Sequence, residues 1–540
     1  MSDHLGLSQE LLASIAGLSP PHTEINTPDD LRSAVVDAVE EKKRMVRELV
    51  DDIARLKSIH NSVAPVNRLP PELLAMVYTY ATADEETYSQ LVDITHVCQL
   101  WRTTALNAAS LWTRIAVNDP VGIETFLKRA KNLPVSLSVT ICRPPVVATV
   151  RLITSEMHRV RSLTVRVPAD IALDVVTNRL KIAAPLLEQF SIEKVESKWV
   201  RRPMPAEEHE RSVPLLYMPS LRSLSLSNVP LFYIPQGPNS LTELTLHRKL
   251  PSPDILLHLL GSSPALKTLC MRGTFEYERI LVREEIKLPK LEVLHLSTFP
   301  PQGIANLLAS VVLPKKTKIA IHAPLDVIHE FEDLFVNPLP PIPPTVGLAC
   351  LKGLRRLELC WDVEDLDLRA YHGADDFTEP ALHIEASHIG PYPGNRFLAN
   401  WAFDTSQVET LVLCGTAWRE RGAAERPVAR TWWGPMFDAL PALRTVRVMC
   451  IGEKTLDEFV ASFLIGPNHE LENIELVDVR PGPVFWARLH LMLTMRGAGR
   501  PGGSVKRVEL VDVGDGHGWT PDVVESIRAD KGVEVVWDSD

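Results

Sequence analysis

Three histidines and two acidic residues lie close together in the second half of the sequence, and their side chains are of the types that bind metal ions. They are His372, Asp375, Asp376, His383 and His388. Imidazole and carboxylate groups are common ligands of Zn²⁺, but the histidine spacings of 11 and 5 residues match no helical metal-binding motif. His383 also stands between Leu382 and Ile384, in a segment that reads as a β-strand. We therefore expect loop and surface histidines here, and no metal site.

Other chemical signatures are equally weak. The glycine-rich stretch of residues 514–518 could cradle an anion, but it lacks the lysine and serine of a phosphate-binding loop, so a plain turn is favoured. The seven cysteines form no Cys-x-x-Cys pair, which argues against a zinc ribbon or a redox dithiol and favours reduced thiols. The sequence contains neither Gly-x-Ser-x-Gly nor His-Glu-x-x-His. We expect no catalytic residue and no cofactor, and hence a protein that is not an enzyme.

Composition narrows the class of protein further. The 540 residues are 45% hydrophobic and 23% charged, as in ordinary globular chains. The net charge of −11 gives no overall basic field for nucleic acid. No apolar run approaches the roughly 20 residues that span a bilayer, and the first 17 residues lack the basic cluster of a secretory signal. We expect a cytoplasmic or nuclear protein that binds neither membrane nor nucleic acid.

The first element that the sequence indicates is a long amphipathic helix over residues 27–64, after a disordered or weakly ordered segment of residues 1–26. Thr27 can cap this helix, Pro28 suits its first position, and Ala64-Pro65 ends it. An apolar stripe at coiled-coil spacing, completed by Lys42 and His60, follows one face: Val39, Val46, Leu49, Ile53, Leu56 and Val63. The helix either forms a coiled coil or lies along a neighbouring domain. Only about three heptad steps are present, which favours packing within the chain.

A small helical module is predicted over residues 65–117. Apolar residues recur at helical spacing in three short segments, which are too small to bury much core by themselves. The segments contain Leu-Pro-Pro-Glu-Leu-Leu from Leu69, Val-Cys-x-x-Trp-Arg from Val97 and Leu-Trp-x-x-Ile from Leu111. An apolar face is therefore left that needs a partner.

These three motifs together resemble the F-box-like domain common in large fungal protein families. Two features depart from that pattern: Val77-Tyr78 replaces the usual Ile-Phe, and the acidic stretch of residues 82–87 lengthens the link to the second helix. The resemblance implies that the module binds a Skp-family adaptor protein and, through it, a cullin. It also implies the adaptor contacts, which are Leu69, Pro70, Leu73, Leu74, Val77, Val97 and Trp101.

From residue 130 onward a Leu-x-x-Leu-x-Leu pattern recurs, with β-branched residues in some copies. The middle residues of five successive copies are separated by steps of 20, 25, 25 and 25; they are Leu224, Leu244, Leu269, Leu294 and Ile319. Such alternation predicts strands with one buried face, and amphipathic helices are predicted between them. The pattern resembles leucine-rich repeats. Residues 130–540 are thus expected to form an α/β solenoid with a curved, mainly parallel sheet and helices on its convex side; an ordinary α/β domain is the alternative.

Four segments interrupt the repeats and are expected to be loops. Residues 194–214 are charged and proline-rich, and residues 338–344 read as a polyproline strut between repeats. Residues 362–380 are rich in acid, and residues 417–434 combine arginines with two tryptophans, including Trp433. A solvated loop is favoured for residues 417–434 over a partner-binding one.

The residues that flank the buried leucines of each strand should line the open face of the sheet. This face is hydroxyl-rich in the early repeats and richer in charge in the late ones. The candidate target-binding residues are Arg356, Glu358, Arg447, Glu475 and Arg507. Two interpretations are open: the charges neutralise one another across adjacent strands, or the arginines form a comb for acidic or phosphorylated segments.

Two functions are consistent with the sequence. The first is the substrate-recognition subunit of a cullin–RING ubiquitin ligase of the SCF type, which binds a Skp-family adaptor through the F-box-like module and an unknown target protein through the repeats. The second is a non-catalytic scaffold for protein interactions, in which the F-box-like helices only cap the solenoid.

Overall fold

The computed structural model divides the chain into two compact units. The first comprises residues up to Val117 together with Glu124–Leu133, and the second comprises Asn118–Ile123 and Pro134–Asp540. The structure describes residues 27–82, 88–141, 146–168, 183–195, 218–229, 239–274, 285–297, 301–324, 348–361, 366–373, 379–387, 404–415, 433, 436–465, 471–479, 481–497, 505–511, 513, 525, 529 and 533–538.

The first unit begins with a 35-residue helix, α2 (Pro28–Ser62). Its start is fixed by a capping box, as Asp30 donates its backbone N–H to Thr27 Oγ1 at 3.1 Å and Asp30 Oδ2 accepts the N–H of Thr27 at 2.8 Å. The predicted N-cap is therefore confirmed. The segment of residues 1–26 lies outside the described residues.

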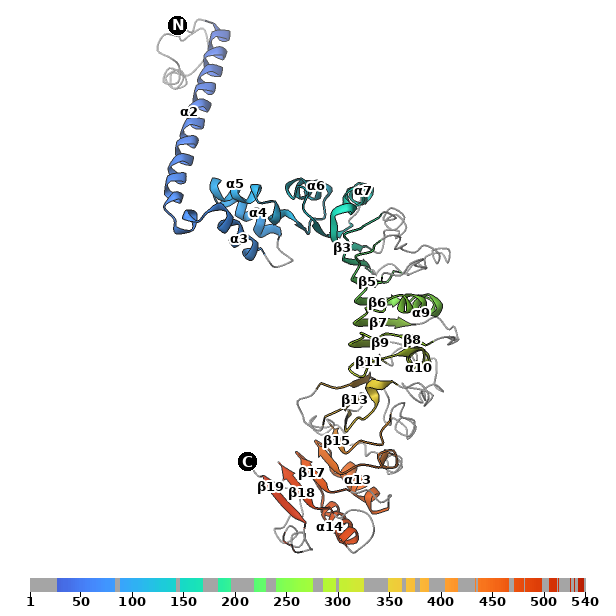
Figure 1. The fold of residues 1–540 in the computed structure, drawn as a ribbon. Helices are drawn as coiled ribbons and strands as arrows, with labels where there is room; N and C mark the ends of the chain where they lie inside the picture. The colour runs from blue at the N-terminus through green and yellow to red at the C-terminus, as the bar shows by residue number, and fades with distance from the viewer. Residues whose placement is uncertain are drawn as a thin grey trace. The chain divides into compact units, whose positions relative to one another are not determined.

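The helical module follows α2 in the chain (Figure 1). Its elements are η2 (Pro65–Arg68), α3 (Pro71–Ala81), α4 (Tyr88–Val97), α5 (Gln99–Asn107), η3 (Ala109–Trp112) and the two-residue strand β1 (Arg114–Ile115). Helix α3 packs against both α4 and α5. Trp112 is fully buried, donates its indole N–H to the carbonyl of Ala105 at 2.8 Å and meets the ring of Phe126 edge-on at 4.9 Å. Phe126 lies in α6 (Pro120–Arg129).

The second unit is built on one large, mostly parallel sheet. Its earlier strands are β2 (Val135–Thr140), β3 (Val160–Val167), β4 (Gln189–Lys194), β5 (Ser223–Ser227), β6 (Glu243–Lys249), β7 (Thr268–Thr274), β9 (Val293–Ser297) and β11 (Lys318–Pro324). Its later strands are β12 (Arg356–Trp361), β13 (Leu366–Tyr371), β14 (Leu382–Ser387), β15 (Thr410–Gly415), β16 (Thr445–Met449), β17 (Asn473–Val477), β18 (Arg507–Val511) and β19 (Glu534–Asp538).

Neighbouring strands are in register, so that equivalent apolar residues form continuous rows across the sheet. One row contains Leu224, Leu244, Leu269, Leu294 and Ile319, which are all at most 1% exposed. A parallel row two residues further along each strand is also apolar and buried, whereas the residues between the rows remain partly exposed in most strands. The sheet therefore has one buried face and one open face, as the alternation predicts.

The strand order departs from the order of the sequence between β11 and β15. Strand β11 pairs with β14, and β15 pairs with β12. Between them lies β13, which is antiparallel to both of its neighbours. Strands β12, β13 and β14 thus form an antiparallel meander between β11 and β15. Their order across the sheet is the reverse of their order in the sequence. The expectation that residues 362–380 form only a loop was wrong in part, because β13 lies within them.

Helices cover one side of this sheet (Figure 1). They are α7 (Val146–Glu156), α9 (Pro253–Gly261), α10 (Pro301–Ser310), α13 (Glu453–Ile465) and α14 (Pro483–Gly497), with shorter turns η4 (Met157–Arg159) and η8 (Ala349–Leu351). A separate two-stranded parallel ladder joins β8 (Ile286–Lys287) to β10 (Val311–Val312). The unit is therefore mixed α/β with a large, mostly parallel sheet. In the part of the chain that the structure describes, no helix is long and apolar enough to cross a bilayer.

Several expected loops cannot be compared with the structure. Residues 338–344 and 514–518 lie outside the described residues, as do residues 196–214 of the charged segment. Within residues 417–434 only Trp433 is described, and it belongs to the core. It is fully buried against the rings of Phe437 and Phe459. Trp433 was expected in a solvated or partner-binding loop, and that expectation was wrong for this residue.

Candidate functional site

Helix α3 carries an exposed apolar stripe along one face. Its members are spaced by three and four residues, and therefore lie above one another on the helix. They are Leu73 (47% exposed), Met76 (53%), Val77 (44%) and Tyr80 (77%), continued by Leu69 (36%) and the exposed Pro70 just before the helix. Exposed apolar side chains that adjoin in this way are typical of a surface that binds another protein.

The opposite face of α3 anchors the helix to the module. Leu74 is fully buried and Tyr78 is 1% exposed. Burial raises the pKa of the Tyr78 hydroxyl, because ionisation would place a charge away from water, and the nearby Cys98 thiol adds to the effect. Within the described structure this hydroxyl has no hydrogen-bond partner. Tyr78 stands where the F-box-like pattern has phenylalanine, which has no hydroxyl to satisfy.

The other expected contact residues fall in different surroundings. Trp101 is half-buried: its indole N–H donates to Asn67 Oδ1 at 2.6 Å, and its ring lies 5.2 Å from that of Tyr78. Val97, at the end of α4, is 56% exposed. The structure therefore brings Leu69, Pro70, Leu73 and Val77 into the stripe and places Leu74 in the core, where it has no surface to offer a partner. Sequence reasoning missed Met76 and Tyr80, which the helical period from Leu73 would have indicated.

The early part of the open sheet face is rich in hydroxyl groups. A single row crosses β2 to β6 through Ser138, Thr164, Ser191, Ser225 and Thr245, all in register. Each of these side chains is exposed or half-exposed. This row offers hydrogen-bond donors and acceptors without a fixed charge, and charged residues such as Arg166, paired with Glu193, lie beside it on the same face.

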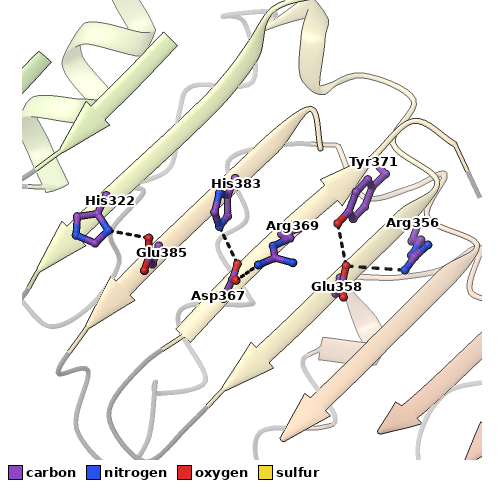
Figure 2. Close-up of polar contacts among 8 residues, drawn as sticks. All are labelled: His322, Arg356, Glu358, Asp367, Arg369, Tyr371, His383 and Glu385. Carbon is purple, nitrogen blue, oxygen red and sulfur yellow. Dashed lines mark hydrogen bonds and ion pairs between the residues drawn. The ribbon is translucent and has the colours of Figure 1, made fainter. Parts of the chain in front are cut away.

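The meander brings charged and aromatic side chains together on the same open face (Figure 2). Glu358 accepts a hydrogen bond from the hydroxyl of Tyr371 at 2.9 Å and lies 3.8 Å from Nη2 of Arg356. The guanidinium of Arg356 stands 5.2 Å from the centre of the Tyr371 ring. Arg356 is only 6% exposed, which differs from its expected position on an open surface. The ring of Tyr371 on the neighbouring strand contributes to this burial.

The remaining charges of the meander are paired as well (Figure 2). Asp367 lies between His383, whose Nε2 is 2.9 Å from Oδ1, and Arg369, which binds Oδ2. Burial by itself raises the pKa of Asp367, but the hydrogen bonds and positive charges of His383 and Arg369 outweigh burial and hold that pKa below its usual value. His322 and Glu385 form a further pair at 3.0 Å. His383 therefore contacts a carboxylate, and His388 lies outside the described residues.

The two other candidate arginines also have carboxylate partners. Arg447 contacts Glu475 across β16 and β17 at 2.5 Å, and Arg507 contacts Glu509 within β18 at 2.9 Å. The Arg447–Glu475 pair agrees with the first interpretation of the sequence, in which charges neutralise one another across adjacent strands, whereas the Arg507–Glu509 pair lies within a single strand. In the described residues, no group of three or more His, Cys, Asp and Glu side chains is arranged to hold a metal ion.

Comparison with models of known protein families gives no match for this chain, and comparison with curated proteins gives none either.

Proposed function

We propose that this chain is the substrate-recognition subunit of an SCF-type cullin–RING ubiquitin ligase. In this proposal residues 65–117 are an F-box-like domain that binds a Skp-family adaptor and, through it, a cullin. Residues 130–540 are a leucine-rich-repeat solenoid that holds a target protein. The chain itself performs no catalysis, because its contribution is to bring the target to the ligase.

The observation that carries the proposal is the exposed stripe on α3. An apolar stripe in contact with water is unfavourable by roughly 25 cal/mol for each Å² that a partner would cover. Leu69, Pro70, Leu73 and Val77 are the proposed adaptor contacts on this stripe, and Val97 is a further one at the end of α4. Leu74 and Trp101 act in the proposal as the inner support of the helix, since one is buried and the other is held by Asn67.

The proposed solenoid is supported by how the strands repeat. Strands β4 to β7, then β9 and β11, pair side by side in sequence order, and all of these pairs are parallel. From β5 to β11 the buried residues of the first row recur at steps of 20, 25, 25 and 25, within the range of leucine-rich repeats. The reversed meander interrupts this order, after which β15 to β19 again pair in parallel and in sequence order. The open face is the proposed target surface, since each repeat adds another pair of outward-facing positions to it.

Capture of a Skp-family adaptor by the full chain tests the adaptor half of the proposal. Leu73→Asp places a charge in the middle of the stripe without disturbing the core, because Leu73 is 47% exposed. If Leu73 is an anchor, its loss costs about 1 to 3 kcal/mol of binding free energy, which is roughly a 5- to 150-fold increase in Kd. Adding Pro70→Ala should weaken capture further.

A matched control is Leu491→Asp, since Leu491 is also an exposed leucine on a helix, 50% exposed on α14. Adaptor capture should be unchanged in this variant. Undiminished capture by the Leu73→Asp, Pro70→Ala double variant would show that these two residues do not contact the adaptor. Absence of capture by the unmodified chain would favour the scaffold function instead.

The target half is tested on the late repeats, in cells whose proteasome is blocked so that bound targets accumulate. Arg447→Glu with Arg507→Glu reverses two partly exposed charges beside Glu475 and Glu509. Arg356 is left unchanged, because a glutamate at this buried position beside Glu358 would disturb the fold. Loss of target capture with adaptor binding intact is expected if the target segment is acidic or phosphorylated. If this double variant still captures its target, the target site lies elsewhere, and the hydroxyl-rich early face is the next candidate.

A further inference from the structure

Helix α2 presents a second apolar stripe, and nothing in the described structure covers it. Every side chain from Val39 to His60 is exposed. The stripe consists of Val39 (45% exposed), Val46 (58%), Leu49 (62%), Ile53 (51%), Leu56 (67%) and Val63 (61%). Within the first unit, the described residues leave α2 exposed from Val39 to His60.

The helix needs a partner for its own stability. An isolated helix gains little stability per residue in water, and most helical stability in proteins comes from burying an amphipathic face. The pairs along α2, such as Lys43–Glu40 and Arg44–Glu41 at 2.7 Å, are exposed. Exposed pairs of this kind add little stability, because the solvent screens the attraction between the two charges. Covering the stripe is the remaining source of stabilisation.

The residues of the stripe specify what kind of partner fits. In a heptad frame the a positions are Val39, Val46 and Ile53, and two of the d positions are Leu49 and Leu56. β-Branched residues at the a positions with leucine at the d positions favour a parallel coiled coil of two helices. A second helix with this same frame satisfies the pattern at every step, and another copy of this chain provides one.

The charges beside the seam agree with a parallel, in-register pair. Position g of one helix then faces position e of the next heptad on the other. Asp52 at g would face Lys57 at e of the second copy, and symmetry forms this pair twice. The contact of Asp52 with Arg55 in its own helix is long, 3.5 Å, and exposed, so it competes weakly. Met45 at g would face Val50 at e, which widens the apolar seam. No like charges face each other at these e and g positions.

We propose that two copies of this chain associate through α2 as a parallel, in-register, two-stranded coiled coil. The seam runs from Val39 to Val63. Lys42 and His60 are the polar positions within it, and each meets its own counterpart in the second copy. Their side chains reach the edge of the seam, and such polar positions fix register at some expense of stability.

Self-association of the full chain tests this proposal, measured by analytical ultracentrifugation over a range of concentrations. The unmodified chain should sediment as a dimer that dissociates on dilution. Leu49→Glu with Leu56→Glu places four carboxylates in the seam and should weaken association by at least about 100-fold. Ala54→Glu adds the same charge on the outer face of α2 and should leave the dimer intact.

Two further variants test the orientation. Asp52→Lys should weaken association about 5- to 20-fold, and adding Lys57→Asp should restore it by re-forming the pair with the signs exchanged. Val46→Cys, at an a position, should form a disulfide-linked dimer on mild oxidation, whereas Ala54→Cys, on the outer face, should not. A chain that stays monomeric, or a dimer that Leu49→Glu with Leu56→Glu leaves intact, overturns the proposal. A dimer that Val46→Cys fails to link overturns the parallel, in-register arrangement.

Discussion

Helices α2 and α3 both expose an apolar stripe, but they differ in what lies on the opposite face. The other face of α3 is anchored by Leu74 and Tyr78 in a core shared with α4 and α5. Helix α2 has no buried side chain from Val39 to His60. Helix α3 is therefore stable before it binds anything, whereas α2 depends on whatever covers its stripe.

This difference separates two uses of exposed apolar surface. On a helix that is already anchored, the stripe is free to bind and release a partner without loss of structure. On an unanchored helix, the stripe is part of the helix's own stability, so binding and folding are coupled. The following predictions test this contrast, from the largest expected effect to the smallest.

The largest expected effect comes from the anchored face of α3. Leu74→Ala should lower the free energy of unfolding of the helical module by about 2 to 5 kcal/mol, because it removes a fully buried side chain. Leu73→Ala, one residue away on the exposed stripe, should lower it by less than about 0.5 kcal/mol. Hydrogen exchange of the α3 amides in the full chain measures both. Equal losses of protection in the two variants would contradict the distinction between anchored face and stripe.

A proline in the exposed part of α2 should destabilise α2 and leave the function of α3 unaffected. Asp51→Pro removes one backbone hydrogen bond and clashes with the preceding turn, which costs about 3 kcal/mol in a helix interior. The α2 amides should lose protection and self-association should fall, while adaptor capture through α3 is unchanged. Asp51→Ala is the matched control, and it should retain the helix. A parallel loss of adaptor capture in the proline variant would mean that the two helices are not independent.

The buried hydroxyl of Tyr78 should act against the stability of the module. Tyr78→Phe keeps the ring against Trp101 and removes an unsatisfied hydroxyl, so the free energy of unfolding should rise by about 1 to 2 kcal/mol. Tyr80→Phe is the matched control, because Tyr80 is 77% exposed and should show no change. Chemical denaturation followed by tryptophan fluorescence compares them. A loss of stability in Tyr78→Phe would show that the hydroxyl makes a favourable contact.

The same residue predicts a dependence on pH. The folded-state pKa of Tyr78 is raised, so the unfolded chain releases this proton first, near its usual pKa of about 10. The titration of Tyr78 therefore leaves the free energy of unfolding unchanged below about pH 10 and lowers it as the pH rises further. Tyr78→Phe should lose less stability than the unmodified chain between neutral and alkaline pH.

The smallest effect is expected at the start of α2. Thr27→Ala removes the side-chain cap and should destabilise the first turn by about 1 kcal/mol, which faster exchange of its amides would reveal. Thr79→Ala in α3 is the counterpart. Its hydroxyl donates to the carbonyl of Ala75 within the helix, and its loss should be nearly neutral. Equal effects would mean that the cap does not define where α2 begins.

Much of this fold was predictable because its signals are local. The cap at Thr27 and the proline at Pro65 delimit α2 through the chemistry of neighbouring residues alone. The alternation of leucines places strands β5, β6, β7 and β9 correctly, since one buried face demands a period of two. The sequence also indicated that charges on the late repeats could neutralise one another, and Arg447 and Arg507 do have carboxylate partners.

Tertiary structure decided what depends on contacts distant in the chain. Leu73 and Leu74 are the same residue type, and only the packing of α3 against its neighbours makes one a surface residue and the other core. The reversed order of β12, β13 and β14 follows from which strand edges pair, and a repeat pattern carries no information on this point. The antiparallel pairing of β12 with β13 placed Tyr371 beside Arg356 and left the arginine only 6% exposed. Local propensity determines where helices and strands form, whereas burial is shared among distant segments and is determined only when they pack.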